Sequence, residues 1–199
     1  MLVLLAVSFI TIGYAAYSSS LNISSEAEVK PDSSNFDVDF SSSADGLDED
    51  DITPTLNKVA TGFSASEAII DNTGNPIVSG IKVTFTEPGQ TATYSFYSYN
   101  KGKYLAYLKN INFNGNKTCT ALEGTTQSLV SSACSGISLS IKVGDEESIF
   151  ASSTLNNHTL LKNSSENINI TITYAEGSDI ADGDFEVTLP SIELVYSSN

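Results

Sequence analysis

Cys119 and Cys134 are the residues whose chemistry the sequence constrains most closely. They are the only two cysteines among 199 residues, and a loop rich in Thr, Ser and Gly separates them. A metal site would need more ligands, and a catalytic thiol would need a nearby base. In an exported protein, which the N-terminus indicates below, two such cysteines pair, and closing the loop contributes about 3 kcal/mol of stability in the chain-entropy model. We therefore predict a Cys119–Cys134 disulfide.

A single histidine, His158, limits the catalytic chemistry that the chain could perform. It stands in the polar stretch Asn156-Asn157-His158-Thr159, which is typical of a turn. One histidine cannot build a metal centre. The sequence contains no HExxH, GxSxG, GxxxxGK or paired-cysteine zinc pattern. We expect no enzymatic activity and no cofactor.

Two acidic clusters supply the hard oxygen ligands that calcium prefers. Neither cluster has the twelve-residue loop with Gly at its sixth position. In the second cluster Asp182-Gly183 is also an ordinary turn pair, so a calcium site and a plain surface turn both remain open. The calcium candidates are Asp45, Asp48, Asp50 and Asp51 in the first cluster, and Asp179, Asp182, Asp184 and Glu186 in the second.

The chain is strongly acidic, with a formal net charge of −15 and an isoelectric point near 4.1. All of its basic residues are lysines. Such a surface repels the phosphates of nucleic acids and anionic lipids, so we expect neither as a partner. Solubility is the plainest reason for the acidity, and cation binding is the alternative.

Residues 1–17 form an apolar segment without a charged side chain. Its length suits the hydrophobic core of a signal peptide and is slightly short for a membrane span. Gly13 and Ala15 are small enough for cleavage after Ala15. The basic residues that usually precede such a core are missing, so cleavage and retention as an anchor both remain open. We predict a signal peptide or membrane anchor over residues 1–16, one folded domain over residues 17–199, and a location outside the cell or at its surface.

Apolar and polar residues alternate through most of the remaining chain, with turn signals between the alternating segments. A period of two is that of a half-buried strand, and no convincing amphipathic helix interrupts the pattern. The prediction is an all-β, antiparallel β-sandwich, immunoglobulin-like or jelly-roll in the broad sense. The clearest alternating sets are Phe36, Val38 and Phe40; Ile81, Val83 and Phe85; Ile137, Leu139, Ile141 and Val143; Ile168, Ile170, Ile172 and Tyr174; Phe185, Val187 and Leu189; and Ile192, Leu194 and Tyr196.

The stretch 87–108 is expected in the middle of a sheet. Pro88-Gly89 is a tight turn, a strand from Thr91 to Tyr99 follows, and Asn100-Lys101-Gly102 is a second turn. A return strand begins at Tyr104, so the stretch is predicted to be a hairpin. The alternation slips within this strand, between one set at Ala92, Tyr94 and Phe96 and another at Tyr97 and Tyr99. The slip predicts a bulge or a strand that is covered on both faces.

Three later features predict interruptions of the strands. The phase of the apolar residues changes between Leu108 and Ile111. Asn114-Gly115 has the composition of a two-residue hairpin turn. Pro190 is expected at an edge or a bulge, because proline cannot donate a hydrogen bond to a neighbouring strand.

The chain resembles a group of exported β-sandwich proteins of Gram-positive bacteria, the TasA/camelysin-like matrix fibre subunits and related surface proteins. The residues that carry the resemblance cover about a fifth of the chain: Glu87-Pro88-Gly89-Gln90, Tyr94, Phe96, Asn100, Gly102, Ala106 and Leu108, together with the apolar segment through Gly13-Tyr14-Ala15. The resemblance implies an extracellular sandwich that assembles into fibres. Some proteins of this group are described as proteases, but no motif of this chain supports that activity. The cysteine pair and the missing basic residues depart from the group.

The first functional hypothesis is a non-enzymatic cell-surface or extracellular matrix protein, with fibre formation by strand addition. The segment 18–30 alternates through Leu21, Ile23, Ala27 and Val29, and it could pair with a neighbouring copy or within its own sandwich. The alternative hypothesis is an adhesin or glycan-binding module. In that case exposed tyrosines could stack on sugars, whereas the same tyrosines could instead pack the sheet. The tyrosines in question are Tyr97, Tyr99, Tyr104 and Tyr107. Partners would be further copies or other surface proteins, and contact with a membrane would be through the N-terminal segment alone.

Overall fold

The computed structural model describes residues 36–46, 52–149 and 158–198. These residues belong to one compact unit, Pro31–Asn199. The predicted signal segment 1–16 and the predicted strand 18–30 lie outside the described residues. Among the described residues, no helix has the length and apolar character needed to cross a bilayer.

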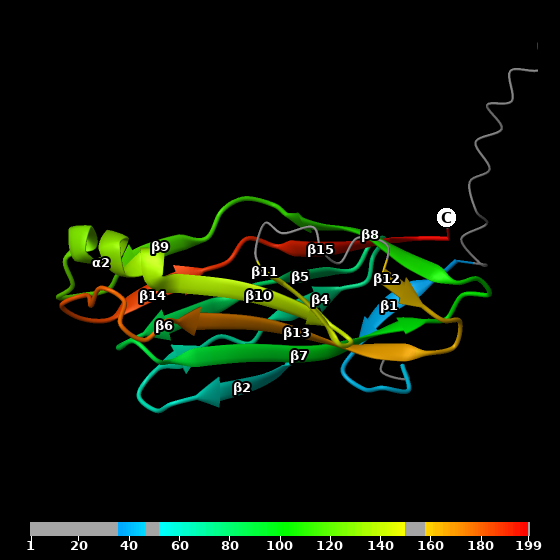
Figure 1. Cartoon of the computed structure of the whole chain (residues 1–199), viewed down its shortest axis with the longest axis horizontal. Coiled ribbons are helices and arrows are strands. Elements are labelled where there is room, and N and C mark those ends of the chain that lie inside the picture. Colours follow the sequence, from blue (N-terminus) through cyan, green and yellow to red (C-terminus); the bar gives the residue numbers. More distant parts are fainter. Residues whose placement is uncertain (1–35, 47–51, 150–157, 199) are drawn as a thin grey trace, which may run out of the picture. The chain divides into compact units, whose positions relative to one another are not determined.

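Three antiparallel sheets make up the described part of the chain (Figure 1). In sheet A, β7 (Thr91–Asn100) is an interior strand. Along one of its edges it pairs with β1 (Val38–Ser41) and β2 (Thr55–Val59). On its other side follow, in order, β13 (Ser165–Tyr174), β10 (Ile137–Val143) and β11 (Glu146–Ile149). Sheet B has the order β3 (Ser64–Ala65), β6 (Lys82–Phe85), β14 (Phe185–Thr188) and β9 (Thr118–Ala121). Sheet C has the order β12 (His158–Leu160), β8 (Ala106–Phe113), β15 (Ile192–Ser197), β5 (Ile77–Ser79) and β4 (Ile69–Asp71). The all-β sandwich predicted from the alternation is confirmed.

Sheets B and C together act as one interrupted layer. Each of the four strands of sheet B is adjacent in the chain to a strand of sheet C, in the pairs β3/β4, β5/β6, β8/β9 and β14/β15. These pairs follow the same lateral order in both sheets. Hydrogen bonds outside the ladders span the interruption, including Leu189 N to Ile81 O at 3.0 Å and Asn114 N to Ser191 O at 3.0 Å. Pro190 lies at this interruption, between β14 and β15, and not at the strand edge or bulge predicted for it. Its missing N–H is consistent with a position outside the ladders.

The core consists of the apolar residues that the alternation placed on one face of each strand. Val83, Phe96, Ile170 and Val187 are all fully buried. A ring cluster marks the end near β6 and β14, where Tyr174 stands edge-on to Phe185 with ring centroids 5.4 Å apart. Both layers contribute side chains to the same interior, so apolar packing joins the two layers.

The hairpin predicted for residues 87–108 is wrong, although β7 is central as expected. Its neighbours in the chain, β6 and β8, belong to sheets B and C, so the chain crosses between layers at each turn. At the second crossing Asn100 is fully buried, and its side-chain amide donates hydrogen bonds to the carbonyls of Tyr104 (2.9 Å) and Leu160 (3.1 Å). The turn composition predicted a reversal of direction but not which sheet the returning strand joins.

The bulge predicted within β7 is also wrong. The pairing of β7 with β13 is continuous from Thr91↔Thr173 to Tyr99↔Ser165. The side chains of Ser98 and Asn100 also point inward and are fully buried. The inward positions of β7 therefore change from apolar to polar residues, while the alternation of buried and half-buried positions continues. Buried polar side chains with hydrogen-bond partners can occupy such positions.

The phase change in β8 is a bulge, as predicted. Its register against β15 shifts between Val195↔Asn110 and Tyr196↔Leu108, which leaves Lys109 as the extra residue. Asn114-Gly115 is not a hairpin turn, because β8 and β9 lie in different sheets. The pair instead lies between β8 and β9, where the layer formed by sheets B and C is interrupted.

A short helix, α2 (Gln127–Ala133), occupies part of the loop between the cysteines and continues into a 3-10 turn, η1 (Cys134–Gly136). In Figure 1 it lies beside β9 and β14. The sequence analysis missed it, because a helix with only two buried residues, Val130 and Ala133, has no apolar period to detect.

Candidate functional site

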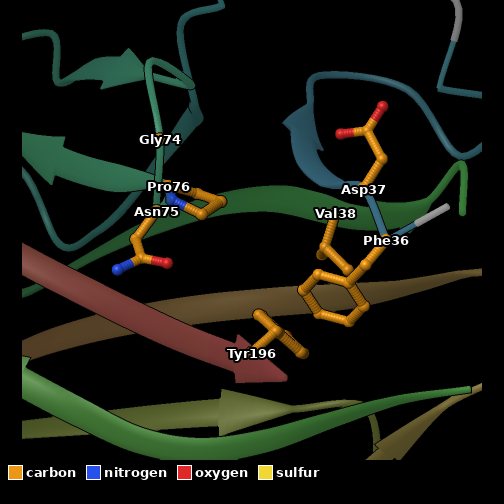
Figure 2. Close-up of a pocket in the computed structure, with 7 residues that line it drawn as sticks. All are labelled: Phe36, Asp37, Val38, Gly74, Asn75, Pro76 and Tyr196. Atoms are coloured by element: carbon orange, nitrogen blue, oxygen red, sulfur yellow. The ribbon is translucent and has the colours of Figure 1, made fainter. Parts of the chain in front are cut away.

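A pocket of about 130 Å³ opens between the edges of the two layers, and we call it the edge pocket. Its lining residues come from the start of β1, the β4–β5 loop and the end of β15: Phe36, Asp37, Val38, Gly74, Asn75, Pro76 and Tyr196. Figure 2 shows Asn75 and Pro76 on one side and Phe36 and Val38 on the other, with Tyr196 between them at the base. The carboxylate of Asp37 points away from the other lining side chains. The lining therefore combines the apolar side chains of Phe36, Val38 and Pro76 with polar groups.

One wall of the edge pocket is an open strand edge of sheet C. Strand β5 pairs with β15 only at Ile192↔Val78 and Glu193↔Ile77, and Leu194 N then donates to Pro76 O at 3.3 Å. Proline has no N–H, so it ends the ladder. Within the described ranges, no strand pairs with Tyr196 on the side away from β8. Tyr196 is two residues beyond Leu194, so its backbone N–H faces the same way, toward the pocket.

The opposite wall is an open edge of sheet A. Phe40 turns its backbone away from β7, because its N–H and C=O bond the side chain of Asn72, each at 2.9 Å. Val38 lies two residues earlier in the same strand, so its N–H and C=O face the same way. Among the described strands β1 pairs with β7 alone. The edge pocket therefore lies between two strand edges, and each edge has backbone groups that face away from its own sheet, at Tyr196 and at Val38.

Charged groups border the edge pocket without filling it. Burial, and then the neighbouring Asp39 carboxylate, raise the pKa of Asp37, while Lys101 acts in the opposite direction. Lys101 pairs with Asp39 at 2.9 Å. On the other side, hydrogen bonds from Asn112 and then Asn75 lower the pKa of Glu193. The amide of Asn75 is thereby held at the rim, 2.9 Å from Glu193 Oε1.

A polar cluster lies beneath the base of the edge pocket. The ring of Tyr196 is buried, and its hydroxyl donates toward Glu166 Oε1 at 3.5 Å. The other oxygen of Glu166 lies 2.5 Å from Nε2 of His158. Ser98 Oγ also lies 3.4 Å from Glu166. His158, predicted to lie in a turn, instead begins β12 and is paired with a carboxylate.

The predicted disulfide between Cys119 and Cys134 is present. Its Cα atoms are 6.0 Å apart, a usual separation for a disulfide. It links β9 to the end of α2. The side chain of Gln127 adds two contacts between the same elements, accepting from Ala121 N at 2.9 Å and donating to Cys119 O at 3.1 Å.

The second calcium candidate cluster surrounds the start of α2. Both oxygens of Asp182 accept hydrogen bonds from Thr126, from its N–H at 2.8 Å and its hydroxyl at 2.6 Å, which lowers the pKa of this carboxyl. Asp179 and Asp184 use their backbone carbonyls, which accept from Tyr174 and Thr125. Over the described part of the chain, no group of three or more His, Cys, Asp or Glu side chains is placed to hold a metal ion. In the first cluster Asp45 bonds Ser43 at 2.5 Å, and the other three candidates lie outside the described residues.

The four tyrosines proposed as a sugar platform do not share one surface. Tyr97 and Tyr99 face outward from sheet A, whereas Tyr107 faces outward from sheet C. The loop at Gly46 passes so close to the Tyr99 ring that a Cβ there would lie 2.5 Å from it. Tyr104 is the most exposed of the four, at 55%. The alternative that these residues pack against neighbours therefore describes Tyr99 best.

The edge pocket could not be predicted from the sequence. The strand through Val38 was predicted, but no local pattern indicates that Asn72 bonds β1 or that Tyr196 lies beside Pro76. Signals existed only for single members, such as a proline beside a strand.

No family model matches the chain, and neither the curated proteins nor the solved structures contain a significant match to it.

Proposed function

We propose that the protein is a non-enzymatic, exported surface or extracellular matrix protein whose copies join by strand addition at the edge pocket. The observation that carries the proposal is the pocket between two strand edges whose outward-facing backbone groups have no strand partner among the described residues. The resemblance of the Glu87–Leu108 region to TasA/camelysin-like fibre subunits supports the same function. The apolar segment 1–16 supports export.

The proposed donor is the segment 18–30 of a neighbouring copy. An added strand would bond the open backbone positions, and one of its apolar side chains would enter the pocket. The volume of about 130 Å³ is close to the roughly 150 Å³ of an apolar cavity that holds benzene, so it suits one large side chain. Leu21, Ile23, Ala27 and Val29 supply such side chains at alternate positions.

The same segment could also fill the pocket of its own sandwich. Phe36 follows Val29 by seven residue steps, and an extended chain of that length spans about 24 Å. Intramolecular and intermolecular pairing would use the same contacts, so their balance is a matter of concentration and of the linker.

A truncation pair tests whether the segment acts between copies. The chain starting at Ala16 should form filaments in electron micrographs, and the chain starting at Pro31 should remain a folded monomer, because it keeps the acceptor and lacks the donor. If the longer chain stays monomeric at high concentration and the shorter one loses thermal stability, the segment belongs to its own sandwich and the assembly proposal is wrong.

A cross-linking pair tests the acceptor site. Oxidation of the Ile23→Cys, Asn75→Cys double variant should give a ladder of covalent oligomers on a non-reducing gel. The matched control carries Ile23→Cys with Asn116→Cys, which is exposed and distant in sequence from the pocket, and should give no ladder. Cross-linked monomers, or an absence of cross-links, would contradict addition between copies at this pocket.

A further inference from the structure

The outer face of sheet A is a regular surface of hydroxyl and amide side chains. We call it the hydroxyl face and define it as three rows across β2, β7, β13 and β10. The rows are Val59–Thr91–Thr173–Ser138, Asn57–Thr93–Thr171–Ser140 and Thr55–Ser95–Asn169–Lys142. The members on β7 and β13 are half-buried and those on β2 are exposed, so the polar groups are accessible to solvent.

Cross-strand hydrogen bonds hold the central side chains of the hydroxyl face in place. The hydroxyls of Thr91 and Thr173 are 3.2 Å apart, as are those of Thr93 and Thr171. Ser95 Oγ donates to Asn169 Oδ1 at 2.6 Å. Each hydroxyl can take part in more than one hydrogen bond, so the ladder orders these groups and leaves them capacity for a ligand.

The hydroxyl face differs from the rest of this acidic chain in its charge. The whole chain has 24 acidic and 9 basic residues, yet the three rows contain no acidic residue, and Lys142 is their one charged member. Beyond β10, Glu147 of β11 occupies the register position next to Lys142. The acid-free area thus covers four neighbouring strands.

We propose that the hydroxyl face binds a neutral polysaccharide. An anionic polymer would be repelled by a chain of net charge −15, and a cationic one would be drawn to the acidic surface elsewhere. A neutral polyhydroxyl chain can exchange its hydrogen bonds with water for bonds to Thr, Ser and Asn without removing a charge from water.

The spacing of the hydroxyl face suits a repeating ligand. Equivalent side chains recur about every 4.8 Å across the strands and about every 6.8 Å along them. No single position is enclosed, so one sugar would bind weakly, and affinity would come from many contacts with one polymer. This inference is independent of strand addition, because the face and the edge pocket use different residues.

Affinity electrophoresis of the purified protein in native gels tests the proposal. Gels containing hydroxyethylcellulose, dextran or mannan should retard the protein in at least one case, and a gel containing alginate, which is anionic, should not. The Thr93→Val, Thr171→Val variant keeps β-branched side chains of the same shape and removes two hydroxyls, so its affinity should fall roughly tenfold. The matched control is Thr84→Val, since Thr84 is half-buried on β6 of sheet B.

Three outcomes would overturn the proposal. One is that no neutral polysaccharide retards the protein. Another is that the hydroxyls of Thr93 and Thr171 make no specific contribution. In that case the double variant would bind polysaccharide as tightly as the unchanged protein, or Thr84→Val would weaken binding as much as the double variant although both variants and the unchanged protein have the same melting temperature. The third is self-association in sedimentation that the double variant abolishes without any retardation by polysaccharide, which would assign the face to contact between copies.

Discussion

At the scale of single residues, Asn100 shows how a polar side chain stabilises the interior of this sandwich. It is fully buried, donates to two carbonyls and accepts from Gly102 N at 3.0 Å. The three partners come from the crossing between sheets A and C and from the end of β12. One side chain thus closes the end of the molecule at which the chain changes layer.

Replacing this residue tests its role. Asn100→Ala should lower the free energy of unfolding by about 3 kcal/mol, because buried backbone groups lose their partners. Urea titration measures the loss, and Asn116→Ala, at an exposed position, is the control. A change equal to that of the control would show that water replaces the lost contacts.

Three core tyrosines make stability sensitive to alkaline pH. Burial raises the pKa of Tyr94 to about 12, and it also raises the pKa values of Tyr174 and Tyr196. Unfolded tyrosines ionise near pH 10, so the stability is complete below that pH and falls as pH rises toward 12.

Unfolding in urea at pH 8, 10 and 11 should show this decline, with ionisation followed by ultraviolet absorbance. Tyr94→Phe should reduce the slope, and Tyr104→Phe, at an exposed position, should not. An equal slope in the unchanged protein and Tyr94→Phe would refute the assignment to Tyr94.

At the scale of elements, the disulfide and α2 form a unit at one end of sheet B. The Cys119–Cys134 bond links the edge strand β9 to the helix, and Asp182 accepts two hydrogen bonds from Thr126, the residue that precedes the helix. The edge of β9 is thereby covered where it would otherwise be open to pairing with another chain.

Removing the disulfide tests this unit. The Cys119→Ser, Cys134→Ser variant should lose about 3 kcal/mol in the free energy of unfolding, since the unfolded chain regains the freedom of the closed loop. Reducing agent should destabilise the unchanged protein similarly and leave the variant unaffected. The non-reduced protein should weigh two hydrogens less than the reduced form, and thiols that react with maleimide before reduction would contradict the pairing.

At the scale of the whole molecule, the two proposals use separate surfaces of one sandwich. The edge pocket lies between the layers, and the hydroxyl face is the outside of sheet A. A matrix protein with both could join copies through strand edges while a neutral polymer lies across the sheets.

Export underlies both proposals and rests on the apolar segment 1–16. Fractionation of the native host should place the protein in the medium or with the membrane, because such a segment directs secretion or anchors the chain. Deletion of residues 1–15 is the control and should retain the protein in the cytosol. A purely cytosolic pool of the unchanged protein would contradict export.

The fold class, most strands and the disulfide could be predicted from the sequence alone. Alternation along β7, β10 and β13 indicates which residues face the core, because side-chain direction in a strand has a period of two. The cysteine pair could be predicted because there were only two. The calcium candidates show the limit of such reasoning, since composition placed Asp182 among possible metal ligands, whereas in the structure both of its carboxylate oxygens accept hydrogen bonds from Thr126.

Which strands are neighbours could not be predicted, because it depends on how the whole chain packs. Turn composition at Asn100 and at Asn114-Gly115 reports a local change of direction, whereas the sheet that receives the next strand depends on burial across the whole core. The edge pocket and the hydroxyl face follow from that choice. Val38 and Tyr196 are far apart in the chain, as are Thr93 and Thr171, and only the pairing of strands in space brings each pair to one surface.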